Sequence, residues 1–95
     1  MSQQMPRVGP PTAGVVESEV EGCVSLYHPE SQEVSVLNQT ASDVWRLSDG
    51  DHTLDQIVVL MARAYGVAPD SIREEVATTV ETFRDKQLFA GEGSP

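Results

Sequence analysis

The chain has 95 residues, which suits one domain with a modest core and makes a deep enzyme cleft hard to build. Six Lys and Arg against fifteen Asp and Glu give a net charge of −9, which argues against nucleic acids and anionic membranes as partners. One cysteine, Cys23, excludes an internal disulfide. No segment approaches a signal-peptide core or the roughly 20 apolar residues of a membrane span, so we expect a cytoplasmic protein.

The two ends of the sequence differ from its middle. Residues 1–13 hold three of the six prolines and show little apolar periodicity, so they predict a flexible tail. Residues 91–95, "GEGSP", predict a second short tail. A single folded domain is therefore expected over residues 14–90.

The first part of that domain has the period of two that is typical of β-strands. In "GVVESEVEG" Val16, Ser18 and Val20 share one face, and three glutamates share the other. "CVSLYH" continues the alternation after a turn at Gly22. A second turn, "HPESQ", precedes a short third strand, "EVSVL", with Val34 and Val36 on one face. These segments predict a small antiparallel three-stranded meander.

After residue 37 the period changes to about 3.6, which predicts three helices. Asn38 is placed to cap the first, whose buried face includes Trp45, and Gly50 can adopt the left-handed conformation that ends it. Thr53 and Gln56 form a capping box for the second. Gly66 ends that helix.

The third helix is expected from Pro69 to about Lys86, with an apolar stripe along it. Strands followed by helices predict an α+β fold, and two short helices joined by a tight turn resemble a helix-turn-helix with a small attached sheet.

Candidate chemical groups are sparse. His28 and His52 are far apart in sequence, and no His or Cys cluster has the spacing of metal ligands. Nothing near Cys23 would activate its thiol. "DGDHTLD", with Asp49 and Asp51, lacks the register of a calcium loop and is interpreted as a polar turn. We expect no catalytic residues, no metal and no cofactor, and hence a protein that is not an enzyme.

The third strand offers a different kind of site. It is an edge of the predicted meander and would present unpaired backbone groups. If the third helix packs beside it, the two form a groove in which an extended peptide could add a strand. The alternative is that this groove closes on itself or on a second copy of the chain. Trp45 shares the apolar face of its helix and is expected in the core.

The order of these features resembles the PqqD-like family, also called the RiPP recognition element. The resemblance rests on an ordered set of residues and on "RAYGVAPDSIREEVATTVETFRDKQLF", and it covers about residues 14–90. The ordered set is Leu37, Asn38, Ala41, Trp45, Asp49, Gly50, Thr53 and Ile57.

The resemblance implies a winged helix-turn-helix-like fold without catalysis, which binds the leader segment of a ribosomally made precursor peptide by strand addition. The implied peptide-binding residues come from the third strand and the third helix. They are Glu33, Val34, Ser35, Val36, Leu37, Val76, Thr79, Val80, Phe83 and Arg84.

Among such proteins the chain looks most like the stand-alone partner of a leader-removing cysteine protease in lasso-peptide biosynthesis. The alternatives are a peptide chaperone for a radical-SAM enzyme in quinone-cofactor (PQQ) biosynthesis and, from a different class, a DNA-binding winged helix. The acidic composition weighs against the last.

Overall fold

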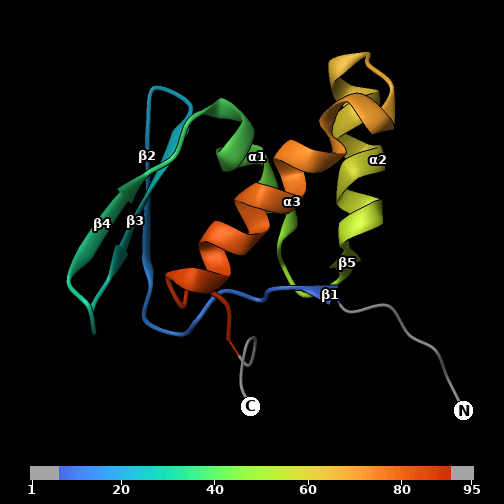
Figure 1. Ribbon diagram of the computed structural model, residues 1–95. Coiled ribbons are helices and arrows are strands. Elements are labelled where there is room, and N and C mark those ends of the chain that lie inside the picture. The colour runs from blue at the N-terminus through green and yellow to red at the C-terminus, as the bar shows by residue number, and fades with distance from the viewer. Residues whose placement is uncertain (1–6, 91–95) are drawn as a thin grey trace, which may run out of the picture.

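A computed structural model describes residues 7–90 and shows a small sheet beside three helices (Figure 1). Strands β2, β3 and β4 form a three-stranded antiparallel sheet in that order, and two short strands, β1 and β5, pair elsewhere. This arrangement confirms the predicted α+β class. The elements are β1 (Arg7–Val8), β2 (Val16–Val20), β3 (Cys23–His28), β4 (Glu33–Val36), α1 (Gln39–Leu47), β5 (His52–Thr53), α2 (Leu54–Tyr65) and α3 (Pro69–Asp85).

The β2–β3 hairpin is closed by a two-residue turn. Val20 pairs with Cys23, and the intervening Glu21 and Gly22 have φ of 54° and 83°. Positive φ at both positions is the signature of a type I′ turn, whose twist matches that of the flanking strands. The meander predicted from the alternating pattern is therefore confirmed, and β4 is an edge strand of this sheet.

The helix boundaries follow the predicted local signals. The Asn38 side chain accepts a hydrogen bond from the backbone N–H of Ala41 at 2.8 Å. Thr53 and Gln56 form a complete capping box at the start of α2, and Gly66 ends that helix with φ of 72°. Pro69 begins α3, and Ala68 precedes it without a side-chain cap. None of the helices in residues 7–90 is long and apolar enough to span a membrane.

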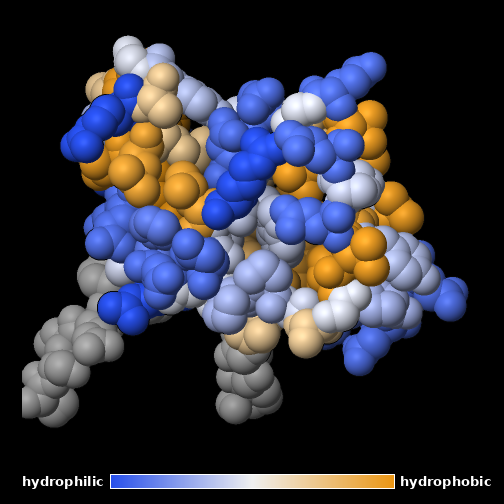
Figure 2. Space-filling model, turned by 180° about the vertical axis from the view of Figure 1, so that it is seen from behind, coloured by the Kyte–Doolittle hydropathy of each residue, from blue (hydrophilic) through white to orange (hydrophobic). Residues whose placement is uncertain are grey.

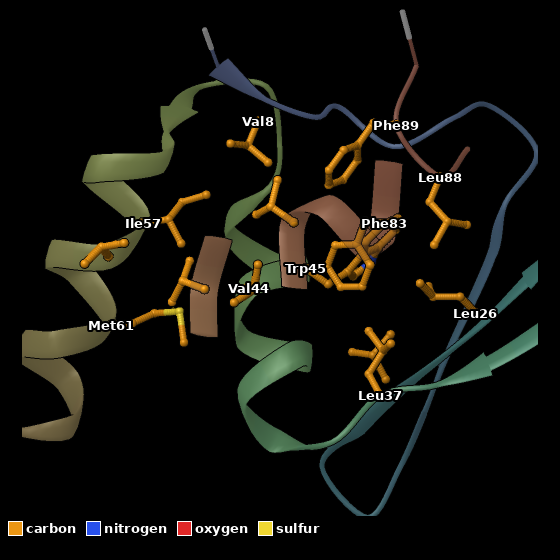
Figure 3. Packing of buried hydrophobic residues seen from close by; sticks show 14 residues of the cluster. Val8, Leu26, Leu37, Val44, Trp45, Ile57, Met61, Phe83, Leu88 and Phe89 are labelled. Carbon is orange, nitrogen blue, oxygen red and sulfur yellow. The ribbon is translucent and has the colours of Figure 1, made fainter. Parts of the chain in front are cut away.

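The core lies between the sheet and the helices and continues among the helices, where Val44, Ile57 and Met61 lie (Figure 3). Trp45 stacks on Phe89 with ring centroids 5.9 Å apart, and both rings meet Phe83 edge to face. Leu26 and Leu37 point from the sheet toward these rings (Figure 3). The prediction that Trp45 belongs to the core is confirmed, since 3% of it is exposed.

Part of the expected N-terminal tail is instead built into the fold. Val8 is 1% exposed, and β1 pairs with β5. Farther along, the Thr12 N–H donates to the Leu88 carbonyl, and the Ala90 N–H donates to the Pro10 carbonyl. The prediction is therefore wrong for this segment, because proline limits helix and sheet but does not prevent single backbone bonds. Residues 1–6 and 91–95 lie outside the described part of the chain.

The glutamates of β2, and not its valines, lie on the face of the sheet that meets the helices. Val24 and Leu26 on β3 are buried against the helices, and the register places Glu17 and Glu19 beside them on that inner face. Consequently the valines of β2 point to the outer face, where Val16 is 56% exposed and Val20 is 61% exposed. An alternating pattern identifies two faces but not which one meets the helices.

Candidate functional site

The backbone of β4 presents hydrogen-bonding groups along one side. The Leu37 N–H donates to the Val24 carbonyl at 2.9 Å, so residue 37 directs its backbone groups toward β3. Alternate residues of an antiparallel strand direct theirs to opposite sides. Val34 and Val36 therefore direct N–H and C=O away from β3, where no other strand of residues 7–90 pairs with β4. This edge can accept an added strand.

A serine from α1 fixes the end of β4 nearest the helices. Ser42 is fully buried, and its hydroxyl oxygen accepts from the Val24 N–H at 2.8 Å. The same hydroxyl reaches the Leu37 carbonyl at 3.5 Å. It therefore bridges the strand pair where β4 leaves the sheet, which ties the position of the edge to α1. Sequence reasoning missed this role, because a serine at a helical position carries no distinctive signal.

The segment that follows α3 lies against β3, the neighbour of the edge strand. His28, at the end of β3, is 5% exposed, and its Nε2 lies 3.1 Å from the Gln87 carbonyl. Its Nδ1 is positioned to accept from the Glu30 N–H at 3.3 Å. These two contacts fit a neutral ring that donates from Nε2. Because Glu33 of β4 pairs with His28, this contact places Gln87, just beyond α3, one strand away from the edge strand.

The ten residues implied by the resemblance divide into two groups. Val76, Val80 and Phe83 are at most 1% exposed and Leu37 is 9% exposed, so these four belong to the core. They face inward because they form the apolar stripe on which α3 packs. The remaining six have accessible surface and belong to the edge strand or to the partly exposed side of α3. They are Glu33, Val34, Ser35, Val36, Thr79 and Arg84.

A hollow of about 370 Å³ adjoins the edge strand. Its walls come mainly from outer-face residues of all three strands, not from α3. They are Val20, Glu21, Cys23, Ser25, Val36 and Leu37. The sequence did not predict this hollow, because it depends on which face of the sheet points outward.

The remaining candidate groups form local contacts and no chemical site. Within residues 7–90 no three His, Cys, Asp or Glu side chains are grouped as a metal site. Asp49 accepts from the Asp51 N–H and lies 3.0 Å from His52, and the Asp51 hydrogen bond is the main cause that lowers the pKa of Asp49. These bonds define the polar turn between α1 and α2. Farther along, burial and a hydrogen bond to Asp43 raise the pKa of Tyr65.

Comparison with known proteins gives a fold and a family. The structure of TbiB1 in complex with the TbiA(beta) leader peptide matches with a TM-score of 0.76 and 19% sequence identity, over 88% of this chain and 98% of that chain. At this identity the likeness establishes the fold. No curated protein sequence matches. The family model described as coenzyme PQQ synthesis protein D (PqqD) matches residues 23–88, which span β3 to just beyond α3. The predicted family is thus confirmed, and the chain belongs to the PqqD family.

Proposed function

We propose that this protein binds the leader segment of a ribosomally made precursor peptide by strand addition to β4, beside α3. The observation that carries the proposal is the free edge of β4, where Val34 and Val36 offer backbone donors and acceptors in pairs. The shared fold with TbiB1, whose structure holds a leader peptide, supports the same kind of ligand.

In an added strand, alternate side chains of the leader would lie on the outer and inner faces of the sheet. Side chains that lie opposite Val34 and Val36 would fall on the outer face of the sheet, because paired residues share a face. Side chains between them would fall on the inner face, beside Ser35 and toward Thr79 and Arg84 of α3. Backbone bonds would supply much of the affinity, and the inner-face contacts would select the sequence.

The buried stripe of α3 has a supporting task in this proposal. Val80 and Phe83 fix the helix against the core, so the partly exposed side of α3 can stand at a set distance from the edge strand. A rigid helix and a ready-made edge lower the entropy cost of ordering a flexible leader. In this proposal the chain binds the leader and leaves the chemistry to a separate enzyme.

The proposed destination of the bound leader is a separate cysteine protease that removes it, as in lasso-peptide biosynthesis. A second candidate is a radical-SAM enzyme in quinone-cofactor synthesis, which the PQQ-synthesis description of the family favours. Both use the same edge of the sheet. They differ in the precursor that binds, so titration with synthetic leaders from each pathway separates them.

Amide hydrogen exchange tests the edge directly. The chain is labelled with ¹⁵N, and a synthetic leader peptide from the proposed pathway is added in excess. We expect slowed exchange at the Val34 and Val36 amides, which point outward from β4. The amides of Glu17 and Glu19 point outward from the opposite edge, β2, and serve as matched controls. Slowed amide exchange at β2 alone would contradict the proposal. So would unchanged exchange at both edges together with no heat of binding.

A further inference from the structure

The outer face of the three-stranded sheet is largely apolar, and its valines and Tyr27 are exposed in the described part of the chain, residues 7–90. Register places side chains from all three strands on this face, since Tyr27 pairs with both Val16 and Val34. Among the valines and Tyr27 the exposed fractions run from 37% at Tyr27 to 77% at Val36, and Cys23 is half-buried. We call these side chains the outer-face patch, which consists of Val16, Val20, Cys23, Tyr27, Val34 and Val36. Apolar surface lies at the right of Figure 2, on the side of the molecule that holds the sheet.

The orientation of this face is held by specific contacts. The Trp45 indole N–H donates to the Glu17 carboxylate at 3.0 Å, and Arg46 forms an ion pair with Glu19 at 2.9 Å. Both glutamates therefore remain on the inner face, and the valines of β2 remain outside. A strand with one solvated face normally turns its polar side chains to water. Contiguous exposed apolar surface of this kind marks an interaction site.

The charges around the patch indicate what would fit on it. Residues 16–37 contain no Lys or Arg, and two of their five glutamates, Glu21 and Glu30, lie in the turns at the ends of the patch, while the other three lie on the inner face. Glu21 borders the hollow at one end of the patch, and Glu30 lies in the turn at the other end. A complementary partner has an apolar centre with Lys or Arg at its margin. A second copy of this chain would bring the same glutamates together.

The patch is also continuous with the proposed leader site. Val34 and Val36 contribute their side chains to the patch and their backbone groups to the free edge of β4. A leader strand added there would place every second side chain on the outer face beside them. The bound leader would therefore widen the patch by one strand.

We propose that the outer-face patch docks the enzyme that processes the leader, through an apolar surface bordered by basic residues, and that the bound leader strengthens this docking. This proposal rests on the proposed function. It names the surface through which the chain with its bound leader would contact the processing enzyme. Docking on the outer face leaves the inner-face leader contacts undisturbed. The enzyme would thereby distinguish loaded chains from empty ones.

The test uses the double variant Val16→Ser with Val20→Ser. Both side chains lie on β2, across the sheet from the leader edge, so leader affinity should stay within about twofold and the circular dichroism spectrum should not change. The probes are a fluorescent synthetic leader and a purified leader protease of the proposed lasso-peptide type. We expect the affinity for the protease to fall at least about tenfold. In the wild type, leader should raise that affinity.

A matched control and two further measurements define the other outcomes. Val59→Ser with Leu60→Ser alters exposed apolar residues on α2, away from the sheet, and should leave protease binding unchanged. The docking surface is wrong if protease binding is lost only in this α2 variant. It is also wrong if both variants bind the protease as tightly as the wild type. The same holds if sedimentation shows a wild-type dimer that the β2 variant abolishes. If the leader fails to bind while protease docking still requires the patch, the proposed function fails and the docking surface stands.

Discussion

The two edges of the sheet have the same backbone geometry and different side chains. On β2 the residues that direct backbone groups outward are Glu17 and Glu19, and both carboxylates are bonded to α1. On β4 the corresponding residues are Val34 and Val36, which are 63% and 77% exposed and uncharged. Charged side chains on an edge discourage pairing with another strand. We infer that β2 is protected against pairing with an added strand and that β4 can accept one.

This difference also explains why the valines face outward. If β2 were turned over, Glu17 and Glu19 would leave α1, and Val16 and Val20 would replace them against the Trp45 region. The present arrangement retains a hydrogen bond to the indole and protects one edge. Its consequence is an exposed apolar face, which a monomeric protein rarely keeps without a use.

The largest expected effect concerns the contact that holds β2 in place. Trp45→Ala should lower the free energy of unfolding by about 3–5 kcal/mol, because it removes a buried ring packed on Phe83 and Phe89 and leaves a cavity. Urea denaturation measures the change. Trp45→Phe keeps an aromatic ring but loses the bond to Glu17, and it should cost less. An equal cost for both variants would show that the Glu17 bond, not the packing, dominates.

The next effect concerns the attachment of β4 to β3. Ser42→Ala should destabilise the fold by about 1–3 kcal/mol, since the buried Val24 N–H would lose its acceptor. The control is Ser18→Ala, an exposed position on the outer face, where a change within about 0.5 kcal/mol is expected. Thermal unfolding compares the two variants. Equal stability of both would mean that the hydroxyl bridge does not position the receptive edge.

A proline on each edge tests the comparison itself. Val36→Pro removes an outward N–H without removing a bond to β3, and proline is tolerated on edge strands. Leader binding should weaken by about 1–2 kcal/mol, roughly 5- to 30-fold by isothermal titration, because one backbone bond is lost and its acceptor is left unpaired. Glu19→Pro makes the matching change on β2. Leader affinity that fell with Glu19→Pro and not with Val36→Pro would place the ligand on the other edge.

Much of the fold was accessible from the sequence because its signals are local. The Asn38 cap, the Thr53–Gln56 box and the Gly66 stop depend on neighbouring residues, and all three are present. The period-two alternation located three strands for the same reason. The edge position of β4 followed from a meander topology, which needs only the order of the elements.

What could not be predicted depends on contacts between distant residues. Val8 is buried because Arg7–Val8 meets His52–Thr53, a pairing that no local pattern encodes. Gly9 illustrates the same limit, since its φ is 89° and an added Cβ would lie 2.1 Å from the Ser48 carbonyl oxygen. The outward face of the β2 valines likewise depends on the bonds from Trp45 to Glu17 and from Arg46 to Glu19, which join residues 28 and 27 positions apart. The apolar stripe of α3 was identified correctly, but packing directs it to the core.

The smallest expected effect separates edge protection from stability. Arg46 bonds Glu19, Asp43 and the Gly22 carbonyl, at exposed or half-buried positions. Arg46→Ala should therefore cost only about 0.2–1 kcal/mol and should cost less at high salt. Titration of this variant should still give one leader per chain, because Glu17 stays bonded to Trp45. A result of two leaders per chain would mean that a second leader binds at β2 once Arg46 is removed. The Arg46 contact, and not the exposed valines of β4, would then be what restricts the leader to one edge.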